Sequence, residues 1–227
     1  MNLSINPRHF LEAAVWEPRR SLPEAMDLVS AAGFSHFDLW AESENEAEML
    51  SDYMKERGLS VIQSHMPLNR YQKADAEVFH QSVMERAKNA KRMDSKILVV
   101  HGDEFDYKNQ PYTAKAALEY NYRFFYDLVD YAAANGMRVA FENTFQEPNR
   151  TATPHFCALA DDLYALVKRY GTKTVGICWD TGHARVQYGA HDMKTLKLVG
   201  DKVICTHIHD NYYDQDLHGF PFTGNID

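Results

Sequence analysis

The chain has 227 residues, of which 45% are hydrophobic and 25% charged, and its formal net charge is −8. This composition excludes a disordered chain, and no apolar stretch approaches the ~20 residues that span a bilayer, so we expect no membrane association. The acidic balance also argues against a general nucleic-acid binder, which needs a basic face.

Seven short apolar runs alternate with amphipathic stretches along the chain. The apolar runs predict strands over residues 3–5, 37–40, 61–65, 97–101, 137–142, 175–180 and 203–209. Between them, helical periodicity predicts helices over residues 21–32, 44–57, 74–93, 113–135, 154–170 and 192–199. Ser21 is a suitable N-cap for the first helix, and Gly33 is a suitable stop.

Strands separated by helices, with no hairpin between them, predict a parallel sheet. The apolar runs are continuous, as is typical of strands that are buried on both faces. Such a sheet is either open and doubly wound or closed into a barrel. Glycine-rich phosphate loops would favour the open sheet, and the sequence has none. Polar residues end five consecutive strands, which favours a (β/α)8 TIM barrel, where all these ends meet at one mouth.

The strand count is one short of a barrel, which typically needs about 250 residues. We therefore expect a single TIM-barrel domain over residues 1–227 that is C-terminally incomplete, with the eighth βα unit missing from this chain. An incomplete barrel would leave unpaired strand edges, which favour association into a homo-oligomer.

Alternation along the strands predicts which side chains point into the barrel. Glu142 shares its face with Ala140, and His207 shares its face with Cys205, whereas Ile204 is expected to point outward. One register brings the polar ends of all five strands to the inner face.

Two carboxylates and an imidazole at one mouth predict a divalent metal site formed by Glu142, Asp180 and His207. Mixed oxygen and nitrogen ligands suit Mn²⁺, Zn²⁺, Co²⁺ or Fe²⁺ better than Ca²⁺, and Mg²⁺ also stays a candidate. The alternative is that the carboxylates are ion-paired and His207 is a core histidine. No Lys or Arg ends these strands, and an uncompensated buried acidic cluster is costly, so we favour one bound cation.

Further polar residues follow the predicted strands. His183 lies three residues after Asp180, on the loop that we expect to follow the strand. It is a candidate metal ligand, a candidate substrate contact, or a turn residue without a functional role. Trp40 is either one wall of a sugar-sized pocket or part of the core. Asp216 and His218 are candidates for an additional metal or substrate contact. The alternative is that they are solvated loop residues without a functional role. Three widely spaced cysteines do not form a disulfide framework, which predicts a reducing, cytoplasmic location.

Five short motifs stand in order at the strand ends: SHMPLN (64–69), VVHG (99–102), FENT (141–144), DTGH (180–183) and HIHDN (207–211). In this respect the chain resembles the xylose-isomerase-like barrel superfamily, which holds sugar isomerases, ketose 3-epimerases, inosose-processing enzymes and endonuclease IV. Residues 218–227 are similar to the family's His-x-x-Pro-Gly-x-Gly-x-Ile-Asp segment, with Phe222 in place of a glycine.

The resemblance implies that Glu142, Asp180 and His207 are metal ligands, with a fourth glutamate ligand on the eighth strand, beyond this chain. Glu142 would also be catalytic, moving a proton next to a metal-bound carbonyl. The residues implied to bind substrate are His65, His101, His183, His209 and Trp40. The implied activity is that of a divalent-metal-dependent isomerase or epimerase acting on a small sugar, sugar phosphate or inosose.

Two alternatives stay open. The endonuclease IV branch has three zinc ions, whose ligands match His65, His101, Glu142, Asp180, His183, His207, Asp216 and His218. Acidic loops at 103–106 and 210–214 argue against it, because they would repel a DNA backbone. The second alternative is a barrel that binds a sugar-like ligand without catalysis.

Overall fold

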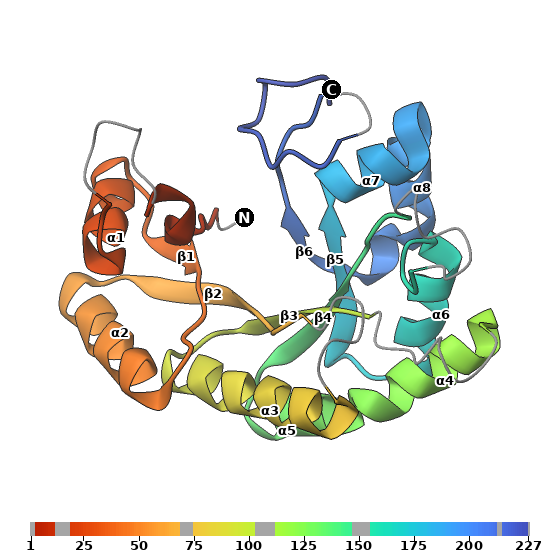
Figure 1. Cartoon of the computed structure of the whole chain (residues 1–227), viewed down its shortest axis with the longest axis horizontal. Coiled ribbons are helices and arrows are strands. Elements are labelled where there is room, and N and C mark those ends of the chain that lie inside the picture. Colours follow the sequence, from red (N-terminus) through yellow and green to blue (C-terminus); the bar gives the residue numbers. More distant parts are fainter. Residues whose placement is uncertain are drawn as a thin grey trace.

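The computed structural model describes residues 3–11, 19–68, 75–102, 112–146, 155–212 and 215–226. Its sheet has six parallel strands that lie side by side in chain order. They are β1 (His36–Asp38), β2 (Ser60–His65), β3 (Ile97–His101), β4 (Arg138–Glu142), β5 (Val175–Asp180) and β6 (Val203–His207). The sheet curves, and the helices cover its outer side (Figure 1). Six parallel strands in this order form the parallel α/β half-barrel of a TIM-barrel fold, as the sequence predicts.

The helices are α1 (Leu22–Ala31), α2 (Glu44–Arg57), α3 (Ala76–Arg92), α4 (Ala114–Phe124), α5 (Tyr126–Ala134), α6 (Ala160–Tyr170), α7 (Thr181–Tyr188) and α8 (Asp192–Val199). The described residues also form the short 3-10 helices η1 (Pro7–Phe10), η3 (Gly189–His191) and η4 (Gly200–Lys202). The predicted cap is confirmed, because the Ser21 hydroxyl accepts from the Glu24 amide and the Glu24 carboxylate accepts from the Ser21 amide. In the described part of the chain, no helix is long and apolar enough to cross a membrane.

Several predicted elements differ from those observed. Residues 3–5 form only a bridge, between Ile5 and Phe37, instead of a strand. The helix predicted over 113–135 is two helices, interrupted at Phe125. The helix predicted from residue 154, which lies outside the described residues, begins at Ala160, since Cys157 adopts a left-handed φ of 70° that a helix excludes. Similarly, residue 74 lies outside the described residues, and α3 begins at Ala76.

The largest difference is α7, which occupies residues 181–188 where we expected a loop. It begins directly after β5, because the Asp180 side chain accepts from the amide of His183 and so caps the helix. His183 therefore lies in the first turn of a helix and not on a loop.

The predicted alternation holds for most of the sheet. Phe141 and Ile177 face the helices and belong to the main core, whereas Ala140 and Cys178 pack together on the inner side. The prediction for Ile204 was wrong. The β5–β6 register shifts there, and the Ile204 side chain lies over Gly176, inside the barrel.

The shift explains why Cys205 and His207 keep the predicted inward orientation, whereas Val203, which we also expected to point inward, packs against the main core. Ile177 pairs with Val203 and Cys178 with Cys205, so Ile204 is an extra residue between two pairs. The residue at 176 must be small, because a Cβ there would lie 2.5 Å from Cγ2 of Ile204. Beyond the bulge, Asp180 pairs with His207 at the carboxyl edge of the sheet.

Candidate metal centre

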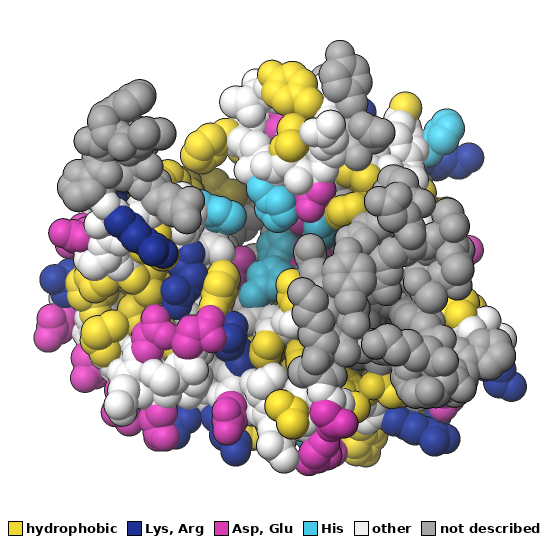
Figure 2. Space-filling view, viewed as in Figure 1, with side chains coloured by type: hydrophobic (Ala, Val, Ile, Leu, Met, Phe, Trp, Pro, Cys, Tyr) yellow, Lys and Arg dark blue, Asp and Glu magenta, His cyan; other side chains and the backbone are white. Residues whose placement is uncertain are grey.

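The carboxyl ends of β2 to β6 bring five polar side chains together at one mouth: His65, His101, Glu142, Asp180 and His207. Figure 2 shows histidine side chains gathered in the hollow of this face. Strand register explains the gathering, since His101 pairs with Glu142, and Asp180 pairs with His207. The structure thus brings together the three residues that the sequence predicts as ligands.

Glu142 lies at the centre of this cluster and is only 1% exposed. One carboxylate oxygen, Oε2, lies 3.1 Å from Nε2 of His101 and 3.4 Å from Nε2 of His65. The other, Oε1, lies 3.1 Å from Nδ1 of His207 and 3.3 Å from Nδ1 of His183. A single carboxylate therefore faces imidazole nitrogens on both of its sides.

Asp180 is the second buried carboxylate, also 1% exposed. Its Oδ2 lies 3.7 Å from Nδ1 of His207, and both of its oxygens lie within 3.0 Å of Nε2 of His209. The side chain of Asn143 bonds both backbone groups of Asp180, accepting from its amide at 2.7 Å and donating to its carbonyl at 3.0 Å. Asn143 thereby fixes the strand end from which the carboxylate projects.

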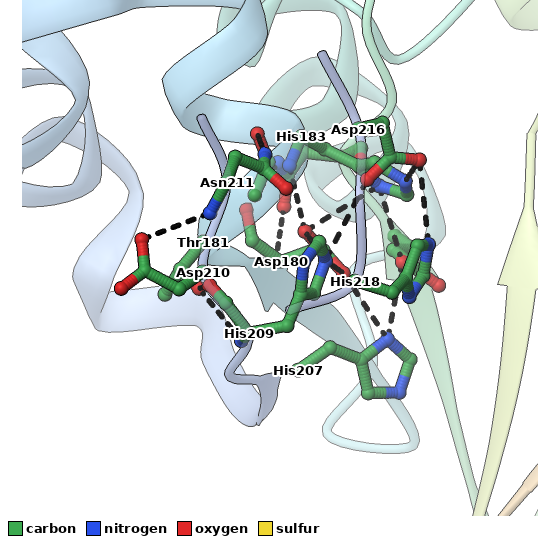
Figure 3. Close-up of polar contacts among 12 residues, drawn as sticks. Asp180, Thr181, His183, His207, His209, Asp210, Asn211, Asp216 and His218 are labelled. Atoms are coloured by element: carbon green, nitrogen blue, oxygen red, sulfur yellow. Dashed lines mark hydrogen bonds and ion pairs between the residues drawn. The ribbon is translucent and has the colours of Figure 1, made fainter. Parts of the chain in front are cut away.

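A third group forms around Asp216, in the loop after β6 (Figure 3). Its Oδ2 lies 3.4 Å from Nε2 of His183 and 3.3 Å from Nε2 of His218. The ring of His218 stacks on that of His209, with centroids 4.1 Å apart. β6 ends at His207, two residues earlier than predicted, so His209 lies beyond the strand.

The C-terminal loop that carries Asp216 and His218 is held by Asp210 and Asn211. The Asp210 carboxylate accepts from the amides of Asn211, Gly224 and Ile226. The Asn211 side chain donates to the carbonyl of Gly182 and accepts from the amide of Leu217. The sequence predicts no role for either residue beyond the HIHDN motif, although an Asp and an Asn directly after a strand favour side-chain hydrogen bonds to loop backbone.

The sequence analysis missed Asp38, at the end of β1. Its carboxylate is buried, and its Oδ2 lies 3.7 Å from Nε2 of His207. The signal was an acidic residue within the apolar run 37–40. β1 ends at Asp38, two residues earlier than predicted, so Trp40 lies beyond the strand, with its ring centroid 6.5 Å from that of His65.

The charges of the cluster compensate one another. Burial alone would raise the pKa of Glu142, but His207 and His101 hold that pKa well below its usual range. Burial would likewise lower the pKa of His207, but the Glu142 carboxylate, followed by Asp38 and Asp180, raises it to about 10. In contrast, burial lowers the pKa of His65 to about 3, so this ring is neutral.

The donor set fits a divalent cation. Within the described residues, the groups whose ligand atoms all lie within 4.8 Å of one another include His65–His101–Glu142, Glu142–Asp180–His183, Glu142–Cys178–His207, Asp38–His65–His207 and His183–Asp216–His218. Oδ1 of Asp216 is buried and has no hydrogen-bond partner in this part of the chain. Carboxylate oxygens and imidazole nitrogens are the ligands that Mn²⁺, Zn²⁺ and Fe²⁺ take in proteins.

Residues 26–227 match the family model described as xylose isomerase-like TIM barrel. Three similar solved structures cover the whole chain at low identity. A D-tagatose 3-epimerase-like protein has a TM-score of 0.78 and 19% identity, with 83% of its own chain covered. The IOLI protein with a binding zinc atom has a TM-score of 0.74 and 16% identity, with 81% covered. An AP endonuclease of family 2 from Brucella melitensis has a TM-score of 0.73 and 18% identity, with 84% covered.

Two curated relatives match over shorter stretches. The uncharacterized protein y4fM of Sinorhizobium fredii is 43% identical over 67 residues, which are 29% of this chain and 21% of that protein. The uncharacterized protein MJ1311 of Methanocaldococcus jannaschii is 26% identical over 149 residues, which are 63% of this chain and 47% of that protein. The chain therefore spans less than half the length of either relative.

Proposed function

The chain belongs to the xylose isomerase-like TIM barrel family, and from this premise we propose that it is a divalent-metal-dependent isomerase or epimerase of a small sugar-like substrate. The observation that carries the proposal is the position of Glu142, a buried carboxylate flanked by imidazole nitrogens and neighboured by Asp180. The single domain, the cytoplasmic location and the homo-oligomer stay predictions of the sequence.

We assign Glu142, Asp180 and His207 as the metal ligands, because His207 contacts both carboxylates, and Mn²⁺, Zn²⁺, Co²⁺, Mg²⁺ and Fe²⁺ are the candidate ions. The groups with all ligand atoms within 4.8 Å join Glu142 to Asp180 and His183, or to Cys178 and His207. When bound, such a cation supplies the positive charge that polarises a substrate carbonyl. The three side chains suit a shared cation because Nδ1 of His207 lies 3.1 Å from an oxygen of Glu142 and 3.7 Å from an oxygen of Asp180.

Glu142 is the residue that we propose to move the proton on the carbon next to the carbonyl. Its low pKa makes it a carboxylate at neutral pH, which is the form that accepts a proton. His183, whose Nδ1 lies 2.8 Å from the carbonyl oxygen of Asn143, is rigidly held and would bind a substrate oxygen. Asp216 and His218 would fix His183 from its other side.

The remaining predicted substrate contacts surround this centre. His65 and His101 lie edge to face with centroids 5.7 Å apart, and Trp40 lies edge to face with His65. The Arg8 guanidinium lies 4.9 Å from the centroid of the Trp40 ring and donates to its backbone carbonyl. A ring held in this way offers an apolar wall to the C–H groups of a sugar, and His209 would close the pocket opposite.

The test is exchange of solvent deuterium into the C–H group beside the carbonyl of ketoses and inososes, followed by NMR with Mn²⁺ or Co²⁺ present. We expect exchange in the wild type and its loss in Glu142→Gln, with Glu44→Gln on the surface of α2 as the control. Absence of exchange with every ketose and inosose, together with cleavage of abasic DNA, would overturn the proposal.

A second candidate is an AP endonuclease with three zinc ions. The observation in its favour is the His183–Asp216–His218 group, which could hold a cation besides those near Glu142. The net charge of −8 opposes binding of a DNA backbone. Metal content by mass spectrometry decides between the two, since three zinc ions per chain favour the nuclease and one exchangeable ion favours the isomerase.

A further inference from the structure

The Asp38 carboxylate is buried inside the barrel without the partners that a buried charge needs. Asp38 is 8% exposed, and within the described residues its Oδ1 has no hydrogen-bond partner. Its Oδ2 receives only a long hydrogen bond, 3.5 Å from Nε2 of Gln63. Because burying a carboxylate is costly unless it is paired, this side chain needs a cationic or donor group nearby.

That group is the imidazole of His207, which separates Asp38 from the other carboxylates. Nε2 of His207 lies 3.7 Å from Oδ2 of Asp38, and it too has no hydrogen-bond partner in the described part of the chain. Nδ1, on the other side of the ring, faces Glu142 at 3.1 Å and Asp180 at 3.7 Å. The ring of His65 stacks on that of His207, with centroids 4.9 Å apart, and holds its plane.

We propose that Asp38 is a positioning residue for His207: it keeps the ring proton on Nε2, so that the Nδ1 lone pair faces the cation held with Glu142 and Asp180. The proposal rests on the metal centre of the proposed function. A metal-binding histidine commonly directs its other N–H at a carboxylate, which fixes the tautomer and makes the ligand nitrogen more basic. At 3.7 Å the pair is not a formed hydrogen bond, and the carboxylate acts through its charge, which favours a proton over a lone pair on Nε2.

The same atoms argue against a separate cation between Asp38, His65 and His207, although their ligand atoms lie within 4.8 Å of one another. His207 would then use Nε2 for one ion and Nδ1 for the other, which requires both ring protons to be lost. A proton on Nε2 directed at the Asp38 carboxylate requires no such step, and it places a donor beside the buried charge.

The experiment compares metal binding and tautomer in the full chain. Affinity for Zn²⁺ and Mn²⁺ is measured by chelator competition for the wild type, Asp38→Asn and Asp38→Leu, with Asp52→Leu on the exposed face of α2 as the control. Loss of an outer carboxylate typically costs about 10- to 100-fold in metal affinity, and we expect this for Asp38→Leu. Asp38→Asn loses the charge but keeps an oxygen dipole facing Nε2, so it is also expected to lose affinity, though less than Asp38→Leu, and the control is expected to bind as the wild type.

Long-range ¹H–¹⁵N spectra of the histidine rings give a readout that does not depend on activity. The spectra are recorded with Zn²⁺ bound, because a pKa of about 10 leaves the metal-free ring of His207 protonated on both nitrogens at neutral pH. We expect the form with Nε2–H and a proton-free Nδ1 in the wild type, less of it in Asp38→Asn, and least in Asp38→Leu. Should Asp38→Leu not fold, the Asn variant decides, since its charge is lost: an affinity and a fraction of the Nε2–H form equal to those of the wild type refute the proposal.

Two results would overturn this role, namely unchanged affinity and tautomer in Asp38→Leu, or lost activity at full affinity, which would place Asp38 on the substrate. Failure of the proposed function is recognised separately. A wild type that exchanges no deuterium with any ketose, yet loses metal affinity on Asp38→Leu, refutes the isomerase and leaves the positioning role standing.

Discussion

Gly182, in the first turn of α7, lies directly against the ring of His209. A Cβ at position 182 would lie 1.9 Å from Cε1, 2.5 Å from Nδ1 and 2.6 Å from Nε2 of that ring. The backbone of His209 cannot easily retreat, because its amide and carbonyl both bond the hydroxyl of Thr181. Gly182→Ala must therefore push the ring away from the Asp180 carboxylate, which it contacts at 2.9 Å and 3.0 Å.

Two contributions determine the size of the effect. Losing a hydrogen bond to a buried charged group costs about 1.5–3 kcal/mol, and overpacking typically costs about 1–3 kcal/mol. Alanine recovers about 1 kcal/mol over glycine within a helix. We expect Gly182→Ala to lower the free energy of unfolding by about 2–4 kcal/mol, since the ring can relieve part of the clash by turning toward solvent.

Urea unfolding of the metal-free protein measures this change. Gly200→Ala is the matched control, because nothing lies within 4 Å of a Cβ at that position and its φ is −57°. We expect the control to stay within about 0.5 kcal/mol of the wild type. In His209→Ala the ring is absent, so adding Gly182→Ala to it should cost much less than Gly182→Ala alone. A Gly182→Ala protein as stable as the control would refute the reasoning.

Despite burial, the Glu142 carboxylate raises the pKa of His207 from 6.5 to about 10, so the stability that this group contributes is complete below pH 6.5 and is lost toward pH 10. Urea unfolding of the metal-free protein at pH 6.5 and 9 checks this, and higher stability at pH 9 would contradict it. Asp210→Ala removes an acceptor of three loop amides, so we expect faster proteolysis within 211–226, and an unchanged digestion pattern would count against it. Phe141→Ala in the fully buried outer core should cost about 3–5 kcal/mol of stability. The control Phe222→Ala, at a side chain that is 98% exposed, should cost less than about 0.5 kcal/mol, and equal losses in the two variants would be inconsistent with this core.

The sequence was sufficient to predict the strands that carry the candidate ligands. Glu142, Asp180 and His207 end apolar runs, and parallel strands present such ends at one edge. The sequence was not sufficient for Asp38, since β1 is short and its predicted end was placed at Trp40. The sequence also did not predict α7. Asp180 both ends β5 and caps α7, and apolar periodicity does not reveal a helix that follows a strand with no loop between them.

The sequence alone determined the order of the elements, their parallel pairing and the inward face of most strands, because these follow from the local spacing of apolar residues. Only the tertiary structure decided which nitrogen of His207 faces which carboxylate, and that the ring of His209 covers Gly182. Those contacts depend on register, bulges and curvature between strands that lie far apart in the chain. Ile204 shows the difference between the two: strict alternation predicts an outward side chain, and the shift in the pairing with β5 turned it inward.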